Sequence, residues 1–280
     1  MRYTSSTEKT KENGQSSSFK NMKILAIETT GKYGSASVID DDGRVFSASS
    51  SEEMNHLRGM ITLIDEAIRK AGITKYDLTH IAASVGPGSF TGIRIGVTTA
   101  RIMSQMLGIP CITVSTLEAM AKRALGKAVS SGALYVVPVI NARRHQTYAG
   151  VYEAVFTTDH EQQSAVAVME ERQYMIEELI EELRTRLSEY DGAAVLFTGD
   201  GIDAYRNIIE SSMTEGSYMF TDEDLRYQHS ESVAEIALGR ANAGETLEYD
   251  ELMPEYMRLA EAEQRLRAGT LSDRIKTARI

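Results

Sequence analysis

The chain has 280 residues, of which 42% are hydrophobic and 25% are charged, and its formal net charge is −10 at pH 7. This composition is typical of a soluble globular protein with one large domain or two modest ones. The acidic balance argues against a main nucleic-acid-binding surface. The single cysteine, Cys111, excludes an intrachain disulfide and a cysteine-based zinc site. No apolar stretch is long enough to span a membrane, so we expect a cytoplasmic protein.

The first half of the chain predicts three strands and then alternating helices and strands. Residues 1–21 are polar and lack the apolar centre of a signal peptide, so we expect a disordered extension there. From Lys23, tight turns separate the strands KILAIETT, GSASVID and RVFSASS. A helix closed by Gly72, the strand HIAASV, a helix over 91–107, the strand CITVS and a helix over 116–125 follow. This order predicts a mixed sheet covered by helices.

The second half repeats the same order after GKAVSSG, residues 126–132, which we expect to be a linker. The strands ALYVVPVINA, QTYAGVYEAVF and QSAVAVM precede the helix YMIEELIEELRTRL, the strand AAVLFTGDG and a helix from Asp203. Two similar halves predict a duplicated α/β fold with a cleft between two lobes. The expected parts are a first lobe over 22–128, a second lobe over 129–242 whose helix 230–242 packs back on the first, and a C-terminal segment over 243–280.

One predicted helix carries a line of small residues. In SVGPGSFTGIRIGVTTARIMSQMLG, glycine, alanine or serine recurs at every fourth position from Gly88 to Gly108. A glycine inside a helix costs about 1 kcal/mol relative to alanine, but it allows another backbone to approach closely. Two interpretations remain open. The helix is central in its own fold, which we favour, or part of the smooth face packs against another protein.

Three turns at strand ends are of a kind that can approach a nucleotide. The turn Gly86-Pro87-Gly88-Ser89 leaves N–H groups free at a helix N-terminus, although the lysine of a P-loop and the spacing of the dinucleotide fingerprint are missing. Glu28-Thr29-Thr30 and Thr198-Gly199-Asp200-Gly201 also end strands. Plain turn chemistry is the alternative for each. The candidate nucleotide-binding residues are Glu28, Thr29, Gly86, Gly88, Gly199 and Gly201.

The sequence predicts neither a catalytic site nor a metal site. His56 opens the first helix, but a metal pair on one helical face would need a ligand at position 60, and Met60 is a poor one. The other histidines show no ligand spacing. No Ser/His/Asp or Cys/His constellation can be proposed from spacing.

Several stretches closely resemble the TsaB family, the dimerization subunits of the bacterial tRNA threonylcarbamoyladenosine machinery. They are MKILAIETT, SVGPGSFTGIRIGVTTARIM, NARRHQTYAGVYE, FTGDG and PEYMRLAEAEQRL, in order over residues 22 to about 266. The resemblance implies a two-lobed, duplicated fold of the actin/sugar-kinase/Hsp70 kind with mixed β-sheets. It also implies paralogy with TsaD, the subunit that transfers threonylcarbamoyl to the adenosine beside the anticodon. TsaD carries an H-x-x-x-H metal pair where this chain has His56 and Met60, which implies a non-catalytic subunit.

The resemblance also implies partners. The first two helices are expected to pair with TsaD, and TsaE is expected to dock near the same junction. No cofactor is required, and the junction is where ATP or ADP would bind. tRNA is contacted only through the complex, and the smooth face predicts a homodimer when the chain is alone. The interface residues carried over are Leu57, Met60, Ile61 and Ile64 on the first helix and Gly88, Gly92, Arg94, Gly96 and Ala100 in the glycine-rich block.

Two departures and two alternatives accompany this resemblance. The family's first strand often ends in Asp where this chain has Glu28, and its second-lobe motif usually begins with Asp where this chain has Asn141. The second change weakens any catalytic role for that loop. A glycoprotease-type metallopeptidase and a stand-alone ATP-hydrolysing enzyme are the alternative functions.

Overall fold

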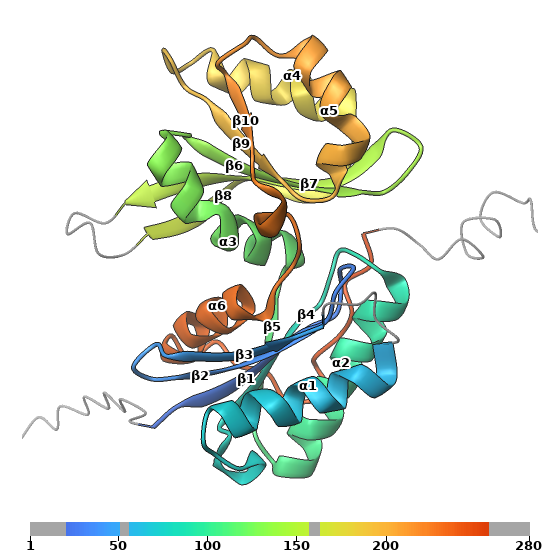
Figure 1. Cartoon of the computed structure of the whole chain (residues 1–280), viewed down its shortest axis with the longest axis vertical. Helices are drawn as coiled ribbons and strands as arrows, with labels where there is room; N and C mark the ends of the chain where they lie inside the picture. The colour runs from blue at the N-terminus through green and yellow to red at the C-terminus, as the bar shows by residue number, and fades with distance from the viewer. Residues whose placement is uncertain (1–20, 51–55, 157–162, 258–280) are drawn as a thin grey trace, which may run out of the picture.

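The computed structural model describes residues 21–50, 56–156 and 163–257, and the chain forms two lobes, each built on a five-stranded sheet (Figure 1). The strand order of the first sheet is β3-β2-β1-β4-β5, and that of the second is β10-β9-β6-β7-β8. The strands of the first sheet are β1 Lys23–Glu28, β2 Ser35–Asp40, β3 Val45–Ser49, β4 His80–Ser84 and β5 Cys111–Val114. Those of the second are β6 Tyr135–Asn141, β7 Gln146–Phe156, β8 Gln163–Met175, β9 Val195–Thr198 and β10 Tyr218–Phe220.

The two sheets share one topology, which confirms the expected duplicated two-lobed α/β fold with mixed β-sheets. In the first lobe, β2 pairs antiparallel with both β1 and β3, and β4 pairs parallel with β1 and β5. In the second lobe, β7 pairs antiparallel with β6 and β8, and β9 pairs parallel with β6 and β10. Each lobe is therefore a three-stranded meander followed by two parallel strands, and the sequence order predicts all of these strands except β10.

Helices cover both faces of each sheet (Figure 1). On the first sheet, α1 and α2 pack on the outer face and α6 on the inner face. On the second sheet, α4 and α5 pack on the outer face and α3 on the inner face. No helix in the described part of the chain is long and apolar enough to cross a membrane. The helices are α1 His56–Lys70, α2 Phe90–Leu107, α3 Thr116–Ser131, α4 Ile176–Leu187, α5 Gly201–Ser212 and α6 Ser230–Asn242, with short 3₁₀ turns at Lys75–Asp77 and Glu223–Leu225.

The two inner helices exchange lobes. α3 follows the first sheet in sequence but packs on β6, β7 and β8 of the second, whereas α6 follows the second sheet and packs on β1, β2 and β5 of the first. α3 and α6 also contact each other between the sheets. The expected boundary between residues 128 and 129 therefore does not separate the two packing units, because α3 belongs by contact to the second lobe.

The expected linker over 126–132 is wrong, because α3 continues to Ser131. Ala124, Leu125 and Ala128 are buried on the inner face of the second sheet, and this burial outweighs the helical cost of Gly126, which is about 1 kcal/mol. The helix ends at Gly132, whose φ of 74° places it in the left-handed region. A single glycine in a helical pattern was thus a poor sign of a linker.

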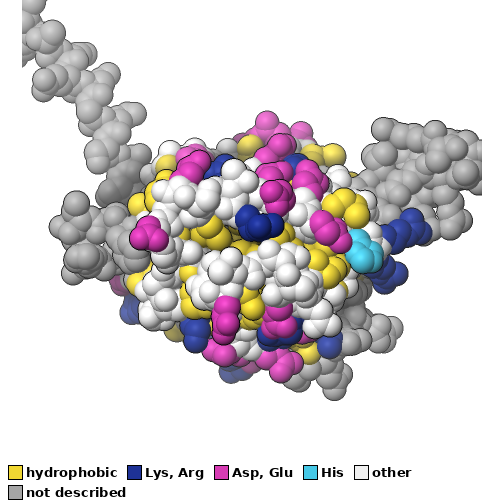
Figure 2. All heavy atoms as spheres, turned by 90° about the horizontal axis from the view of Figure 1, so that it is seen from above, with side chains coloured by type: hydrophobic (Ala, Val, Ile, Leu, Met, Phe, Trp, Pro, Cys, Tyr) yellow, Lys and Arg dark blue, Asp and Glu magenta, His cyan; other side chains and the backbone are white. Residues whose placement is uncertain are grey.

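The second lobe differs from the sequence expectation in three further places. β8 does not stop after QSAVAVM but runs to Met175, pairing with β7 across a bulge near Val151. The helix expected from Tyr174 accordingly begins at Ile176, and Tyr174 is buried in the strand. α5 begins at Gly201, and β10 was not predicted because it is only three residues long. Figure 2 shows the outer end of this lobe, where acidic and basic side chains are interspersed around hydrophobic ones.

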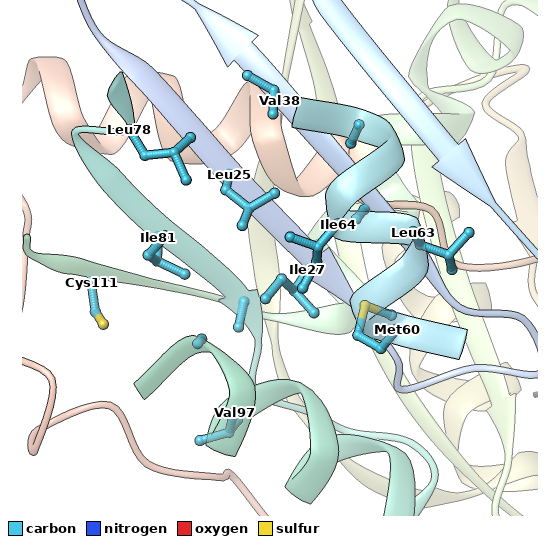
Figure 3. Close-up of a cluster of buried hydrophobic side chains, with 14 of the residues drawn as sticks. Leu25, Ile27, Val38, Met60, Leu63, Ile64, Leu78, Ile81, Val97 and Cys111 are labelled. Atoms are coloured by element: carbon cyan, nitrogen blue, oxygen red, sulfur yellow. The ribbon is translucent and has the colours of Figure 1, made fainter. Parts of the chain in front are cut away.

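Alternating strand residues divide the first lobe into two cores. Leu25 and Ile27 of β1 face the outer helices, whereas Ile24 and Ala26 face α6. Figure 3 shows Met60 and Ile64 of α1 and Val97 of α2 directed at the same side of the sheet. Both faces of the strands are covered, which explains why β1 reads as an apolar run rather than as an alternating pattern.

The segment after α6 forms a C-terminal strap, residues 247–257, along the first lobe. Leu247 pairs with Cys111 at the edge of β5, and the Leu252 side chain is fully buried in the outer core. The Glu255 N–H donates to the Val85 carbonyl at 2.8 Å. The strap then passes the start of α2, so the end of the described chain becomes part of the first lobe's outer surface.

Candidate functional site

A cavity of about 510 Å³ opens between the lobes at the carboxyl ends of β1 and β6. Ligands of open α/β sheets usually bind at such strand ends. Of the six predicted nucleotide-binding residues, only Gly88 lines this cavity. The lining residues are Thr30, Gly31, Lys32, Gly88, Ser89, Ile140, Asn141, Tyr148, Asp200, Tyr227 and Gln228.

Glu28 does not face the cavity, contrary to the prediction. Its carboxylate is fully buried and accepts hydrogen bonds from the Thr30 N–H at 2.5 Å, from the Thr30 hydroxyl at 2.6 Å and from the Ser84 hydroxyl. Burial raises the pKa of Glu28 above its ordinary value, and these hydrogen bonds oppose the rise only in part. Thr29 is also turned inward, because its hydroxyl donates to the Gly92 carbonyl at 2.7 Å. Both residues fasten the end of β1 to the interior.

The predicted glycines are needed for close packing of the chain against itself. A Cβ at Gly86 would collide with the Glu255 carbonyl oxygen, and one at Gly199 would collide with that of Val139. At Gly201 a Cβ would lie 2.8 Å from the same Val139 oxygen. Close packing of turns therefore accounts for glycine at these three positions, and none of the three lines the inter-lobe cavity.

The inter-lobe cavity does not fit the phosphates of a nucleotide. At the start of α2, the Ser89 side chain accepts the Gly92 N–H at 3.2 Å, so the helix caps itself. The buried Gln228 side chain fills the space above Gly31. The Asp200 carboxylate accepts a hydrogen bond from the Asn141 N–H at 3.1 Å. Part of Asp200 is exposed to solvent, but its carboxylate lies where solvation is restricted, and this raises its pKa above the ordinary value. Lys32 is the one cation among the lining residues, and the Asp200 carboxylate offsets its charge. The cavity therefore has no net positive charge to attract phosphates.

The small-residue line on α2 serves the chain's own fold. Gly92, Gly96, Ala100 and Ser104 are buried, and a Cβ at either glycine would collide with Thr29. The first interpretation of the line is therefore the one that the structure supports: the line lets α2 approach the end of β1. Direct partner contact does not fit Gly92, Gly96 or Ala100, nor the buried Met60 and Ile64 of α1.

A different set of side chains, on α2 and on the adjacent strap, is exposed to solvent; this surface is here named the α2 face. Two of the predicted interface residues, Ile61 and Arg94, are exposed, whereas the side chain of Leu57 lies outside the described residues. Ile102 and Met106 expose 50% and 77% of their surface, which is unusual for large apolar residues. The α2 face consists of Phe90, Arg94, Ile102 and Met106 of α2, with Met253 and Tyr256 of the strap.

Arg94 is held by aromatic rings. Its Nε donates to the Tyr256 hydroxyl at 2.9 Å, and its guanidinium carbon lies 3.9 Å from the centre of the Phe90 ring. The two rings lie 4.9 Å apart, so they support each other. Further along the helix, Arg101 donates to the Met253 sulfur at 3.5 Å. The resemblance pointed to Arg94, but no sequence signal linked it to Tyr256, 162 residues away.

The remaining polar clusters are structural. Ser115 caps α3 by accepting the N–H groups of Leu117 and Glu118, and it donates to Glu171, which Tyr152 also contacts. The Glu171 carboxylate is thus shared by the Tyr152 and Ser115 hydroxyls, and the Ser115 oxygen is engaged in capping α3. Among the described residues, Asp40, Asp41 and Asp42 are the one acidic group close enough to share a metal ion. Asp40 is already engaged by Arg44 at 2.8 Å in a hairpin turn.

Comparisons with known proteins identify relatives along most of the chain. Residues 50–266 match the family described as TsaD, tRNA N6-adenosine threonylcarbamoyltransferase. The tRNA threonylcarbamoyladenosine biosynthesis protein TsaB of Bacillus subtilis is 28% identical over 243 residues, which are 86% of this chain and 96% of the relative. TsaB of Escherichia coli is 26% identical, over 85% of this chain and 95% of the relative.

Solved structures support the same fold. YeaZ from Pseudomonas aeruginosa superposes with a TM-score of 0.67 at 23% identity, over 84% of this chain and 99% of that one. A second structure, of a protein described as similar to peptidase YeaZ from the same organism, gives a TM-score of 0.68 at 22% identity. It covers 85% of this chain and all of the other.

Proposed function

The chain belongs to the family of TsaD, tRNA N6-adenosine threonylcarbamoyltransferase, and we propose that it acts there as a non-catalytic partner subunit. In this role it pairs with TsaD and supports threonylcarbamoyl transfer to the adenosine beside the anticodon of tRNA. Its end-to-end similarity to proteins named TsaB supports this assignment over that of the transferase itself. The named transferases align with only about a third of the chain: one from Chlorobium phaeobacteroides covers 35% of it.

The α2 face is the single observation that carries the proposal. Large apolar side chains in contact with water are costly unless another surface covers them. Ile102, Met106 and Met253 are each at least half exposed and lie on one layer of the first lobe. TsaD is the partner that we propose for this face, and contact through it involves these residues and Ile61 rather than the buried glycines.

The rest of the chain supports a subunit without chemistry of its own. The described polar clusters are capped or paired internally, and the inter-lobe cavity does not fit nucleotide phosphates. We therefore propose that this chain requires no cofactor and that ATP or ADP in the complex binds at the junction of the subunits. TsaE docking near that junction, tRNA contact only through the complex and action in the cytoplasm complete the proposal. Without TsaD, the α2 face would pair with itself in a homodimer.

The test is sedimentation velocity of the full chain mixed with TsaD from the same organism. A one-to-one complex is expected, together with threonylcarbamoyl transfer to tRNA that depends on this chain when the other components are supplied. The same preparation, assayed alone, is expected to hydrolyse neither ATP nor peptides and to contain no stoichiometric metal. Transfer that proceeds equally well without this chain would overturn the proposal, as would robust turnover by the isolated protein.

A further inference from the structure

We propose that Arg94 is a preformed receptor for a carboxylate on the partner that covers the α2 face, and that the C-terminal strap holds it ready. This inference rests on the proposed function, because the partner in question is TsaD. It assigns a chemical role to one interface residue and a positioning role to Tyr256, which lies in a segment that follows both lobes in sequence.

The geometry fixes one edge of the guanidinium and leaves the other available. Nε is engaged by the Tyr256 hydroxyl at 2.9 Å, and the plane is supported by the Phe90 ring at 3.9 Å and by the Tyr256 ring at 5.8 Å. These contacts restrict the side chain while Arg94 stays exposed. The two terminal nitrogens make no hydrogen bond within the described part of the molecule. An arginine with its terminal donors aligned binds a carboxylate through two parallel hydrogen bonds.

The charge around Arg94 favours an acidic partner group. α2 contains two arginines and no acidic residue, although the whole chain has 40 acidic residues against 30 basic ones. Neither Arg94 nor Arg101 forms an ion pair with any described carboxylate; both are engaged by the strap instead, through Tyr256 and Met253. Arg94 on the α2 face, with Arg101 beside it, therefore has no counter-charge among the described residues, and the uncharged polar residues exposed along the same helix are Thr91, Thr98 and Gln105. Such a surface matches a partner surface that is largely apolar with a carboxylate in it.

Positioning by the strap has an energetic reason. A free arginine loses rotamer entropy when it binds, whereas one already stacked on the Phe90 ring and hydrogen-bonded to the Tyr256 hydroxyl loses less. Tyr256 supplies both a ring and a hydrogen-bond acceptor, so it orients the guanidinium as well as shielding it. Removing the hydroxyl alone should therefore weaken carboxylate binding without removing the charge.

The experiment measures the affinity of the full chain for TsaD at two or more salt concentrations. Arg94→Lys keeps the charge but loses the bidentate fork, and we expect about a tenfold loss of affinity. Tyr256→Phe keeps the ring, and we expect about a threefold loss. Arg94→Gln should also flatten the salt dependence of binding, because one charge pair is lost. Arg184→Lys, at an exposed arginine of the second lobe, is the matched control and should bind like the wild type.

The outcomes separate this inference from the function on which it rests. If the wild type binds TsaD and Arg94→Lys binds equally well, the receptor role is wrong and the partner role stands. An unchanged salt dependence in Arg94→Gln would also overturn the inference. If the wild type does not bind TsaD, both fail together. Melting temperatures of all variants, compared with the wild type, show whether a loss of binding comes from loss of the fold.

Discussion

The outer helical layers of the two lobes occupy equivalent places in a duplicated fold, yet the charged residues of α2 in the first lobe differ in their partners from those of α4 and α5 in the second. On the second lobe, Arg184 pairs with Glu181 and Arg206 pairs with Glu210, each at 3.3 Å and each within one helix. On the first lobe, α2 has only arginines, and rings or a sulfur atom hold them. The described part of α4 and α5 has no large exposed apolar side chain, whereas α2 has three.

This difference shows how one architecture can carry two kinds of surface. A helix whose charged side chains pair with each other has a polar surface with little net charge. Covering that surface with another protein gains little free energy. A helix that exposes apolar side chains and unpaired cations is more stable when another surface covers it. The fold fixes where the layers lie, and the side-chain inventory of each layer then decides which one is available for a partner.

The largest expected effect concerns two glycines inside helices, one in α2 of the outer layer and one in the inner helix α3. Gly92→Ala should lower the free energy of unfolding by about 3 kcal/mol, because the new Cβ collides with the Thr29 carbonyl and α2 must move away from β1. Gly126→Ala is the matched control: its helical site is open, so it should raise stability by up to about 1 kcal/mol. Urea unfolding of both variants measures the two effects. Equal effects would mean that the close approach of α2 to β1 does not matter.

The next largest effect should distinguish binding from stability. The double variant Ile102→Asp, Met106→Asp should weaken TsaD binding about a hundredfold, because two charges would be buried at an apolar contact. Both side chains are exposed in the free protein, so its melting temperature should change little. Val166→Asp, at an exposed site on β8 of the second lobe, should leave the affinity unchanged. A double variant with wild-type affinity would remove the α2 face from the interface.

A smaller effect should appear as a pH dependence of the first lobe. Burial raises the pKa of Glu28 above its ordinary 4.5, so the folded state holds this proton more tightly than the unfolded chain. The contribution of Glu28 to the free energy of unfolding is therefore greatest below pH 4.5 and decreases as the pH rises through the higher pKa of the folded state. In Glu28→Gln, the free energy of unfolding measured with urea should decrease less steeply between about pH 5 and pH 8 than in the wild type. The exposed Glu181→Gln should leave it unchanged, and an unchanged slope in Glu28→Gln would contradict the assignment.

The smallest effect is expected on the second lobe. Arg184→Gln breaks an exposed ion pair within one helix, so it should change the free energy of unfolding by less than about 0.5 kcal/mol. It should not change the affinity for TsaD. A loss of affinity in this variant would show that the outer layer of the second lobe also contacts the partner, and the contrast between the layers would then disappear.

The sequence predicted the fold well because the fold depends on local patterns. Three short apolar runs with turn residues between them, followed by helical periodicity, specify a meander in each half and the parallel strands after it, except the short β10. Errors arose where tertiary packing outweighed a local signal, as at Gly126 in the middle of α3. The exchange of α3 and α6 could be only partly predicted, since it depends on which of the two sheets the apolar face of each helix packs against.

The site was harder to predict, because glycine and carboxylate patterns do not reveal what they face. Gly92 and Gly96 are compatible with either a partner or the chain's own β1, and only the position of Thr29 decides. Glu28 ends a strand near a cleft but turns inward to Ser84. Phe90 and Tyr256 carry no motif, and their contact joins residues 166 positions apart, which periodicity cannot reveal. Family resemblance pointed to this layer, and the geometry shows which of its residues are exposed.

The exchange of α3 and α6 has a consequence for synthesis on the ribosome. The inner core of the first lobe needs α6, and its outer core needs Leu252 of the strap, so the sheet that is translated first cannot be completed until residues near 250 have emerged. The second lobe, by contrast, has all of its strands and helices once α5 and β10 have been made. The lobe that starts the chain is therefore the last to finish folding, and the inner apolar face of its sheet stays without its helix until α6 has been made. A ribosome that stalls before α6 would leave that sheet exposed to aggregation.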